Sequence, residues 1–137
     1  MARIESRLAR MGLVLPLPLV PPGGIELPFR PVRVVGRRAI VSGHGPLAPD
    51  GTVARPLGKV GGELSLEQGQ VAARLTGLAI LASLRRELGD LDRITAWTRV
   101  FGMVNATPEF ERHPAVLNGF SDLVLELFGP EIGAHAR

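Results

Sequence analysis

The sequence predicts an α+β domain in which two helices pack on one face of a mixed β-sheet. Three observations support this fold class: two short β-rich runs at hairpin spacing, a long capped apolar helix, and a strand-like run followed by a second apolar helix. With 137 residues and a hydrophobic share of 45%, the chain can bury one sizeable core. We therefore treat residues 1–137 as a single domain.

The hairpin is the first expected element of the sheet. Residues 32–35 and 39–42 are rich in valine and isoleucine, and residues 36–38 separate them at hairpin distance. A loop region is expected over 43–62. Within it, residues 49–51 (Pro-Asp-Gly) are typical of a turn, because proline fixes φ and glycine accepts a positive φ.

The clearest helix signal covers residues 65–88. Ser65 and Gln68 have the spacing of a capping box, in which each side chain bonds the backbone N–H of the other residue. Gly89 supplies the stop. Between these ends, apolar residues recur at helical spacing: Val71, Leu75, Leu78, Ala79, Ala82 and Leu88.

Residues 94–104 are expected to form a strand. One face of it would carry Ile94, Ala96, Thr98 and Val100, and the other Thr95, Trp97, Arg99, Phe101 and Met103. Both faces are largely apolar, so we expect both to be covered, and we interpret Trp97, Phe101 and Met103 as sheet or interface packing. A second helix is expected to open near Pro114, with His113 as its cap, and to end at residues 129–130 (Gly-Pro).

The two ends of the chain carry their own expectations. Residues 1–27 should form a short helix with Ile4, Leu8 and Met11 on one face, followed by an extended proline-rich segment. Prolines in that apolar run argue against a signal peptide, and the run is too short for a membrane span, so we expect a cytoplasmic protein. Because a sheet of three strands is thin, we expect at least one more strand after Arg137.

Composition excludes several classes of function. The chain has no cysteine, which rules out disulfides, zinc–thiolate sites and a thiol nucleophile. His44, His113 and His135 are far apart, so we expect no metal and no cofactor. The net charge of +3 comes from scattered arginines and a single lysine, Lys59, so nucleic acid is an unfavoured partner.

A chain of local motifs resembles one known family. The run 40–46 (Ile-Val-Ser-Gly-His-Gly-Pro) with Gly51 is similar to the "SGQxP…G" strand and loop of the RidA/YjgF family, the reactive intermediate deaminases once called L-PSP endoribonucleases. The helix over 65–88, the strand end at 99–101, the helix start at 116–118 and the terminal 135–137 (His-Ala-Arg) match in order. The likeness runs from about Pro28 to Arg137, and the N-terminal extension is typical of a less characterised branch.

The resemblance implies a chorismate-mutase-like fold, assembled as a homotrimeric barrel with ligand sites between protomers. It implies hydrolysis of 2-imino or 2-enamino acids to 2-keto acids and ammonium. Arg137 falls on the family's carboxylate-binding arginine, Gly43 on a glycine whose backbone lines the pocket, and Asn118 on an asparagine at the helix start. Ser42 and His44 would flank the pocket loop.

Two departures from the family pattern bear on catalysis. Phe29 stands where the family has a tyrosine, so a phenol hydroxyl is missing from the expected substrate site. The family's acidic residue lies on a last strand that this sequence does not contain, and Glu126 and Glu131 are not its equivalents. A non-catalytic trimer that binds small carboxylates is therefore the alternative to a deaminase, and an endoribonuclease is a third, less favoured reading.

Each candidate residue also has a structural interpretation. Arg137 could be a surface arginine, Asn118 a solvent-facing polar residue and Gly43 a strand-end bulge. A catalytic triad of Ser42, His44 and Asp50 is disfavoured because all three lie on one strand and loop. Residues 58–61 (Gly-Lys-Val-Gly) lack the spacing of a phosphate loop.

Overall fold

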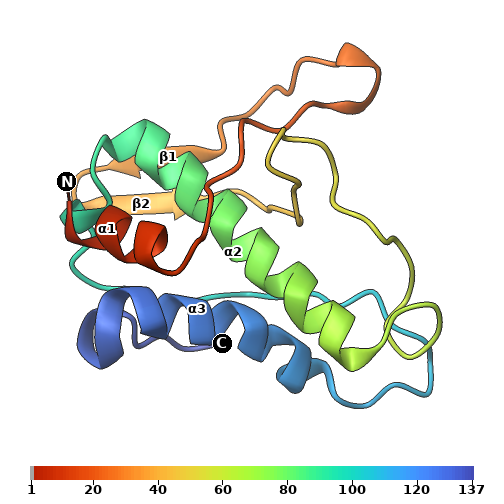
Figure 1. Cartoon of the computed structure of the whole chain (residues 1–137). Helices are drawn as coiled ribbons and strands as arrows, with labels where there is room; N and C mark the ends of the chain where they lie inside the picture. Colours follow the sequence, from red (N-terminus) through yellow and green to blue (C-terminus); the bar gives the residue numbers. More distant parts are fainter. Residues whose placement is uncertain (1) are drawn as a thin grey trace.

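The computed structural model describes residues 2–137 as a layered α+β fold, which confirms the predicted class (Figure 1). Its helices are α1 (Arg3–Arg10), α2 (Leu66–Leu88) and α3 (His113–Ile132), its strands are β1 (Val32–Val35) and β2 (Arg38–Val41), and its short 3₁₀ turns are η1 (Pro22–Gly24) and η2 (Leu91–Arg93). The hairpin lies over α2, and α2 packs along α3 (Figure 1).

The predicted capping box starts α2. Ser65 Oγ accepts the backbone N–H of Gln68 at 3.1 Å, and Gln68 Oε1 accepts the backbone N–H of Ser65 at 2.8 Å. The helix ends at Gly89, which adopts the left-handed region at φ 81° and donates its N–H to Arg85 O. Local sequence therefore fixes both ends of the longest element.

The β1–β2 hairpin forms at the predicted place, with both ends of β2 one residue earlier than the expected run 39–42. Gly36 takes φ 60° in the two-residue turn, which a side chain would disfavour. Ser42 donates its N–H to Pro31 O at 2.9 Å, and Val34 lies opposite Ala39. Hydrogen-bonded and non-hydrogen-bonded pairs alternate along an antiparallel ladder. Since Pro31 and Ser42 are a hydrogen-bonded pair, Val34 and Ala39, three pairs further along, are a non-hydrogen-bonded pair. The backbone N–H and C=O of Ala39 therefore point away from β1.

The predicted strand over 94–104 is wrong as a sheet strand. The segment is extended, but its one described bridge joins Arg99 in parallel to Ala136, through Val100 N–H to Ala136 O and Ala136 N–H to Thr98 O. It does not pair with β2 in the part of the chain that the structure describes. A strand requires a neighbour along its edge, and a short tail gives only one bridge.

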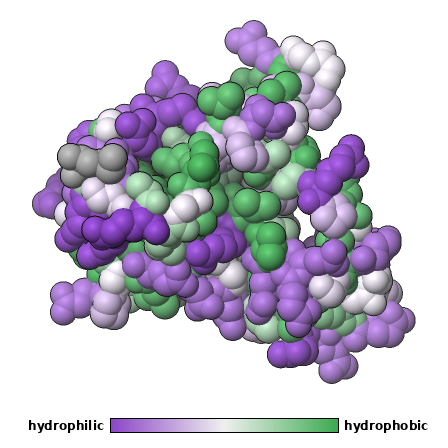
Figure 2. Space-filling model, in the orientation of Figure 1, coloured by the Kyte–Doolittle hydropathy of each residue, from purple (hydrophilic) through white to green (hydrophobic). Residues whose placement is uncertain are grey.

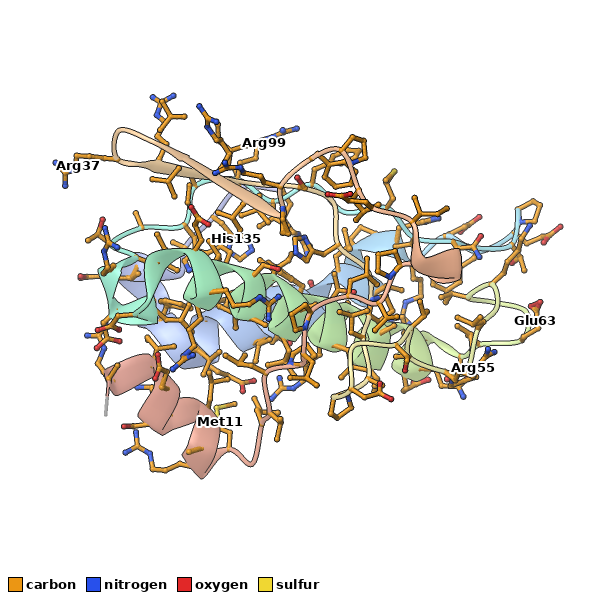
Figure 3. The ribbon with its side chains drawn as sticks, turned by 90° about the horizontal axis from the view of Figure 1, so that it is seen from above. Met11, Arg37, Arg55, Glu63, Arg99 and His135 are labelled. Atoms are coloured by element: carbon orange, nitrogen blue, oxygen red, sulfur yellow. The ribbon has the colours of Figure 1, made fainter. Side chains whose placement is uncertain are left out.

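Within this chain only one face of the segment is covered, so cover on both faces stays a prediction. Trp97 and Val100 pack against the core, whereas Phe101 is 72% exposed and Met103 is 85% exposed. The sheet layer therefore has helices on one side and open apolar side chains on the other. In Figure 3, Arg99 marks the side of this layer that faces away from the helices.

Helix α3 departs from prediction at both ends. Arg112, not His113, occupies the N-cap position, and it makes no side-chain capping bond; the His113 ring instead packs edge-on against Phe110. At the other end, Gly129 breaks the helix with φ 82°, and Pro130 then opens a further turn that reaches Ile132. Proline suits the first turn of a helix, so the Gly-Pro pair kinks the chain without ending it.

The core lies where α1, α2, α3 and η2 meet. Its largest fully buried side chains are Ile4, Leu81, Leu91, Leu123, Val124 and Leu127. Helices α2 and α3 approach closely at glycines: a Cβ on Gly119 would lie 2.1 Å from Gln70 O, and a Cβ on Gly77 would lie 2.9 Å from Leu123 Cδ2. This contact sets the spacing of the two helices.

In the N-terminal region Ile4 and Leu8 of α1 are buried as expected, whereas Met11, expected on the same face, follows the end of the helix and is exposed. Asp92 in η2 caps the helix, because its carboxylate accepts the backbone N–H of Arg3 at 2.8 Å and of Ile4 at 2.9 Å. The extended segment that follows bonds residues 49–51, with Leu17 N–H to Pro49 O at 2.9 Å.

In the view of Figure 1, the middle of the molecular surface is apolar (Figure 2). No helix among residues 2–137 has the length and hydropathy of a membrane span.

We predict that Gly119→Ala destabilises the protein by about 1–3 kcal/mol, as overpacking does. The added Cβ meets the backbone of α2, and this cost exceeds the gain of about 1 kcal/mol that alanine brings to a helix. Chemical denaturation measures the effect. Gly45→Ala is the matched control, because nothing lies within 4 Å of its Cβ position. Equal stability of the two variants would contradict the close approach of α2 and α3.

We also predict that the docking of α1 weakens in acid. Hydrogen bonds from the backbone N–H of Ile4, and then of Arg3, hold the pKa of the Asp92 carboxyl below its usual value. A lowered folded-state pKa contributes stability above the unfolded value and loses it as pH falls through the folded pKa. Denaturation midpoints between pH 6 and pH 2 should therefore fall more steeply for the wild type than for Asp92→Asn. Parallel curves would show that Asp92 is not the cap.

Candidate functional site

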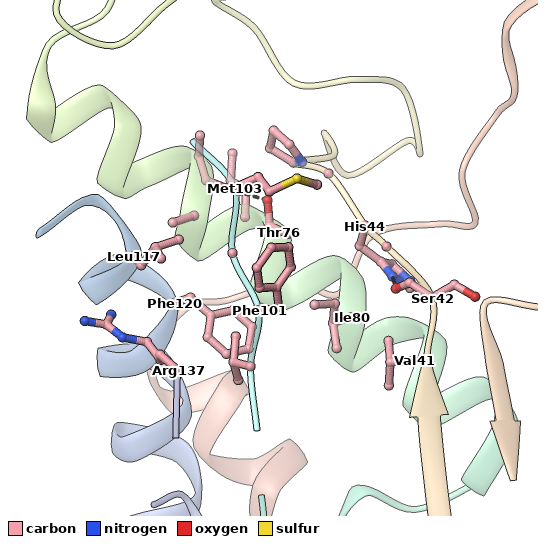
Figure 4. Close-up of a pocket in the computed structure, with 18 of the residues that line it drawn as sticks. Val41, Ser42, His44, Thr76, Ile80, Phe101, Met103, Leu117, Phe120 and Arg137 are labelled. Atoms are coloured by element: carbon pink, nitrogen blue, oxygen red, sulfur yellow. Dashed lines mark hydrogen bonds between the residues drawn. The ribbon is translucent and has the colours of Figure 1, made fainter. Parts of the chain in front are cut away.

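A cavity of about 1670 Å³ lies between the sheet layer and α2. One long side is β2 with the following residues 42–46, the other is the extended segment 94–104, and α2 forms much of its floor (Figure 4). Ser42, Gly43, His44 and Arg137 all line it. Phe29 does not line it and is 56% exposed, so the structure does not bring this candidate to the site.

Arg137 lines the cavity and bonds Asn118, which is not itself one of the lining residues. The guanidinium NH1 donates to Asn118 Oδ1 at 3.1 Å and to Ser121 Oγ at 3.3 Å. Among the described residues, these are the hydrogen bonds of the guanidinium, and both use NH1. The Nε and NH2 edge is therefore available for a planar anion, because a guanidinium fork matches a carboxylate with two parallel N–H···O bonds.

Ser121 was not identified from the sequence. His135 Nδ1 lies 2.7 Å from Gly133 O, and since a carbonyl can only accept, this ring nitrogen donates. In the neutral ring Nε2 then accepts from Ser121 Oγ at 2.8 Å, which leaves the Ser121 oxygen lone pairs for Arg137. The spacing in the sequence could have identified Ser121, because Asn118 and Ser121 are three residues apart and so lie on one face of α3.

A second cluster anchors His44 to α2. His44 Nδ1 donates to Ser42 O at 2.7 Å, and Nε2 accepts from Ser83 Oγ at 2.8 Å. Arg86 NH2 donates to the same Ser83 oxygen at 3.2 Å, and burial lowers the pKa of Arg86. Both nitrogens of His44 are therefore occupied, and its ring ties the pocket loop to the helix.

The remaining candidates are held elsewhere. The Ser42 hydroxyl donates to Arg30 O at 2.7 Å, within the hairpin region. Asp50 accepts the Thr52 hydroxyl at 2.6 Å, which lowers the pKa of that carboxyl, and it does not contact His44. The disfavoured triad of Ser42, His44 and Asp50 is therefore not assembled. Gly43 lines the cavity, with open space where a Cβ would stand.

The chemistry of the cavity follows from these residues. Arg137 offers a fixed positive charge, while Phe101, Leu117 and Phe120 supply apolar walls beside it (Figure 4). Among residues 2–137, no group of three or more histidine or acidic side chains could hold a metal ion. Such a site is suited to a small organic anion with an apolar or planar body.

Comparisons with known proteins agree with this geometry. A family model described as "YjgF/chorismate mutase-like, putative endoribonuclease" matches residues 5–137, a longer stretch than the resemblance from Pro28. Protein TCP17 of Trypanosoma cruzi is 34% identical over 135 residues, covering 98% of this chain and 81% of that protein.

Solved structures give the same result. A protein titled a "putative endoribonuclease" from Shewanella oneidensis superposes with a TM-score of 0.85 at 36% identity, covering 98% of this chain and 84% of that one. Protein Atu1372 of Agrobacterium tumefaciens, titled as of unknown function, gives 0.84 at 33% identity, covering 98% and 79%. The predicted resemblance and its chorismate-mutase-like fold are thus confirmed, and the chain belongs to the YjgF/chorismate-mutase-like family.

Proposed function

We propose that the protein binds small 2-imino or 2-enamino acids by their carboxylate and hydrolyses them to 2-keto acids and ammonium. The observation that carries this proposal is the Arg137 guanidinium, which belongs to a residue that lines the cavity and is held through NH1 by Asn118 and Ser121, with Nε and NH2 unbonded among the described residues. A carboxylate on that edge would make two charge-assisted hydrogen bonds. Such a clamp fixes the adjacent C=N carbon relative to the cavity walls.

The reaction itself needs one water. Water adds to the imine carbon, the resulting carbinolamine loses ammonia, and the keto acid remains; an enamine first takes up a proton to become the imine. Arg137 contributes by holding the carboxylate and by offsetting its negative charge beside the reacting carbon. Phe101 and Phe120, which line the cavity, would limit the number of waters that reach the bound substrate.

We propose further that the protein acts as a homotrimer. The side of the sheet layer that faces away from the helices exposes large apolar side chains: Val35 (54%), Ile40 (60%), Phe101 (72%) and Met103 (85%). An apolar surface of this kind favours burial against another copy. Three sheet layers packed by these faces would form a barrel and place a neighbouring copy beside each cavity.

A non-catalytic carboxylate-binding protein is the second candidate. Phe29 lacks the hydroxyl of the family's tyrosine and lies outside the cavity. Glu67 is the one acidic residue among the described residues that line the cavity, and it belongs to the first turn of α2. These two observations favour binding over turnover.

We predict that Arg137→Ala lowers kcat/KM for 2-aminoacrylate by about 100-fold, as expected for the loss of two hydrogen bonds to a charged group. The assay couples the protein to a pyridoxal-phosphate enzyme that releases 2-aminoacrylate and follows pyruvate. Arg112→Ala, which removes an arginine with no side-chain capping bond, should leave the rate unchanged. Wild-type rates equal to those in buffer would reject the deaminase. RNA cleavage that co-purifies with the protein and is lost in Arg137→Ala would favour a nuclease instead.

We predict that Asn118→Ala and Ser121→Ala each weaken pyruvate binding by about fivefold, because each removes one neutral hydrogen bond worth about 1 kcal/mol. Calorimetry measures the affinity, and circular dichroism confirms that α3 remains folded. Pyruvate binding without imine turnover would select the second candidate. If neither pyruvate nor a larger keto acid binds the wild type, both candidate functions fail.

A further inference from the structure

The side of the cavity that follows β2 is a loop with little packing of its own. We call residues 43–57 the loop wall. Both of its ends, 43–46 and 54–57, line the cavity, and its middle forms a turn. Within the loop wall, Leu47 and Gly51 are the buried residues. A loop that buries so few side chains takes its position from the hydrogen bonds that reach it from elsewhere.

Among the described residues, three hydrogen bonds join the loop wall to distant parts of the chain. Two come from the N-terminal region, where the backbone N–H groups of Leu17 and Val20 donate to carbonyl groups in residues 49–51 at 2.9 and 3.1 Å. The third joins His44 Nε2 to Ser83 Oγ of α2 at 2.8 Å. The loop wall is thus held at its middle and at one end.

The N-terminal segment that reaches the loop wall is itself fixed to the core. We call residues 13–20 the strap; it runs from α1 past α2 to the loop wall (Figure 1). Leu13 and Leu15 of the strap pack against the core. Its later part lies directly on the loop wall, since a Cβ on Gly51 would stand 2.2 Å from Pro18 O. The strap therefore fixes the middle of the loop wall relative to the core.

Arg86 of α2 connects the strap with the third attachment. Its NH1 donates to Pro16 O at 3.4 Å, and its NH2 donates to Ser83 Oγ at 3.2 Å. Ser83 is buried, and its hydroxyl donates to His44, which follows Ser42 in the loop after β2 (Figure 4). A planar guanidinium donates in fixed directions, so Arg86 holds the strap and the His44 contact in one arrangement.

We propose that Arg86 and the strap position the loop wall for ligand binding at the cavity. Arg86 does not line the cavity, so it is a positioning residue that acts through Ser83 and His44. Release of the strap would let the loop wall, with Gly43 and His44, move away from α2 and widen the cavity. This positioning rests on the proposed function only for the identity of the ligand, because the attachment of the loop wall is measurable without one.

Hydrogen exchange by NMR tests the attachment in the unliganded protein. Leu17→Pro removes an N–H that bonds the loop wall. Leu19→Pro is the matched control, because Leu19 also follows a proline and its N–H has no partner among the described residues. The amides of Ala48 and Ala54, which bond within the loop wall, should exchange about fivefold faster in Leu17→Pro and at the wild-type rate in Leu19→Pro. Equal rates in all three proteins would overturn the proposal.

Pyruvate affinity, measured by calorimetry, tests the consequence for the site. Arg86→Ala should weaken binding about fivefold, the factor expected when the loop wall keeps its binding arrangement about one fifth of the time. Arg85→Ala is the matched control: it removes the same charge from the neighbouring position, where Arg85 pairs with Glu5 at 3.1 Å, and affinity should not change. Arg86→Lys should remain weak, because a lysine does not reproduce the two directed bonds. Full affinity in Arg86→Lys, or equal loss in Arg85→Ala, would show an effect of charge and contradict positioning.

A double variant distinguishes one shared cause from two separate ones. Leu17→Pro should also weaken pyruvate binding about fivefold, and its combination with Arg86→Ala should weaken it no further, because both release the same loop wall. Two independent effects would multiply to about 25-fold and contradict a common strap. Circular dichroism and denaturation confirm that each variant is folded under the assay conditions. If the wild type does not bind pyruvate, the proposed function fails, and the exchange rates of Ala48 and Ala54 decide by themselves whether the strap holds the loop wall.

Discussion

The close packing of α2 on α3 is the constraint on which the rest of the structure depends. At Gly119 the two backbones approach so closely that a Cβ would meet Gln70 O at 2.1 Å. That contact fixes the distance between α3, which carries Asn118 and Ser121, and α2, which carries Ser83. The packing of α2 on α3 therefore sets the relative positions of the two hydrogen-bonded clusters, because the His44 cluster is attached to α2 and the His135 cluster to α3.

The two clusters follow the same chemical plan. In each, a histidine donates from Nδ1 to the carbonyl two residues before it and accepts at Nε2 from a helix serine, which in turn accepts from an arginine. The His44 cluster fastens the loop after β2, and the His135 cluster fastens the C-terminal tail. The difference lies in the arginine: Arg86 is partly buried and bonds Pro16 O, whereas Arg137 is exposed beside the cavity. Only the second cluster offers a charge to a ligand.

The sheet layer explains why the cavity is so wide. Residues 97–103 bond the tail on one side, and β2 bonds β1 on its far side, so the two inner edges face each other without pairing. Unpaired edges are places where backbone hydrogen bonds remain to be made. On the outer face of the same layer, Phe101 and Met103 are exposed. Within residues 2–137, the layer therefore has backbone polar groups without partners along its inner edges, and apolar side chains open to solvent across its outer face.

Local sequence determined the elements whose ends are set by neighbouring residues. The capping box of α2, its stop at Gly89, the Gly36 turn of the hairpin and the short α1 helix were all predictable, because each depends on interactions within a few positions. Arg137, Asn118 and Gly43 were named from their resemblance to a family pattern. Ser121 was not, because its role depends on a histidine that lies 14 residues away in the sequence.

Tertiary structure alone decided the features that need a distant partner. Residues 94–104 have the composition of a strand, yet a strand exists only where another edge meets it, and here the tail supplies a single bridge. Phe29 and Ser42 have suitable chemistry by sequence, but packing leaves one outside the cavity and commits the hydroxyl of the other to Arg30. Sequence thus determined the helices, the hairpin and the identity of the cationic group. The position of that group, and which edges remain open around it, came from contacts between residues far apart in the chain.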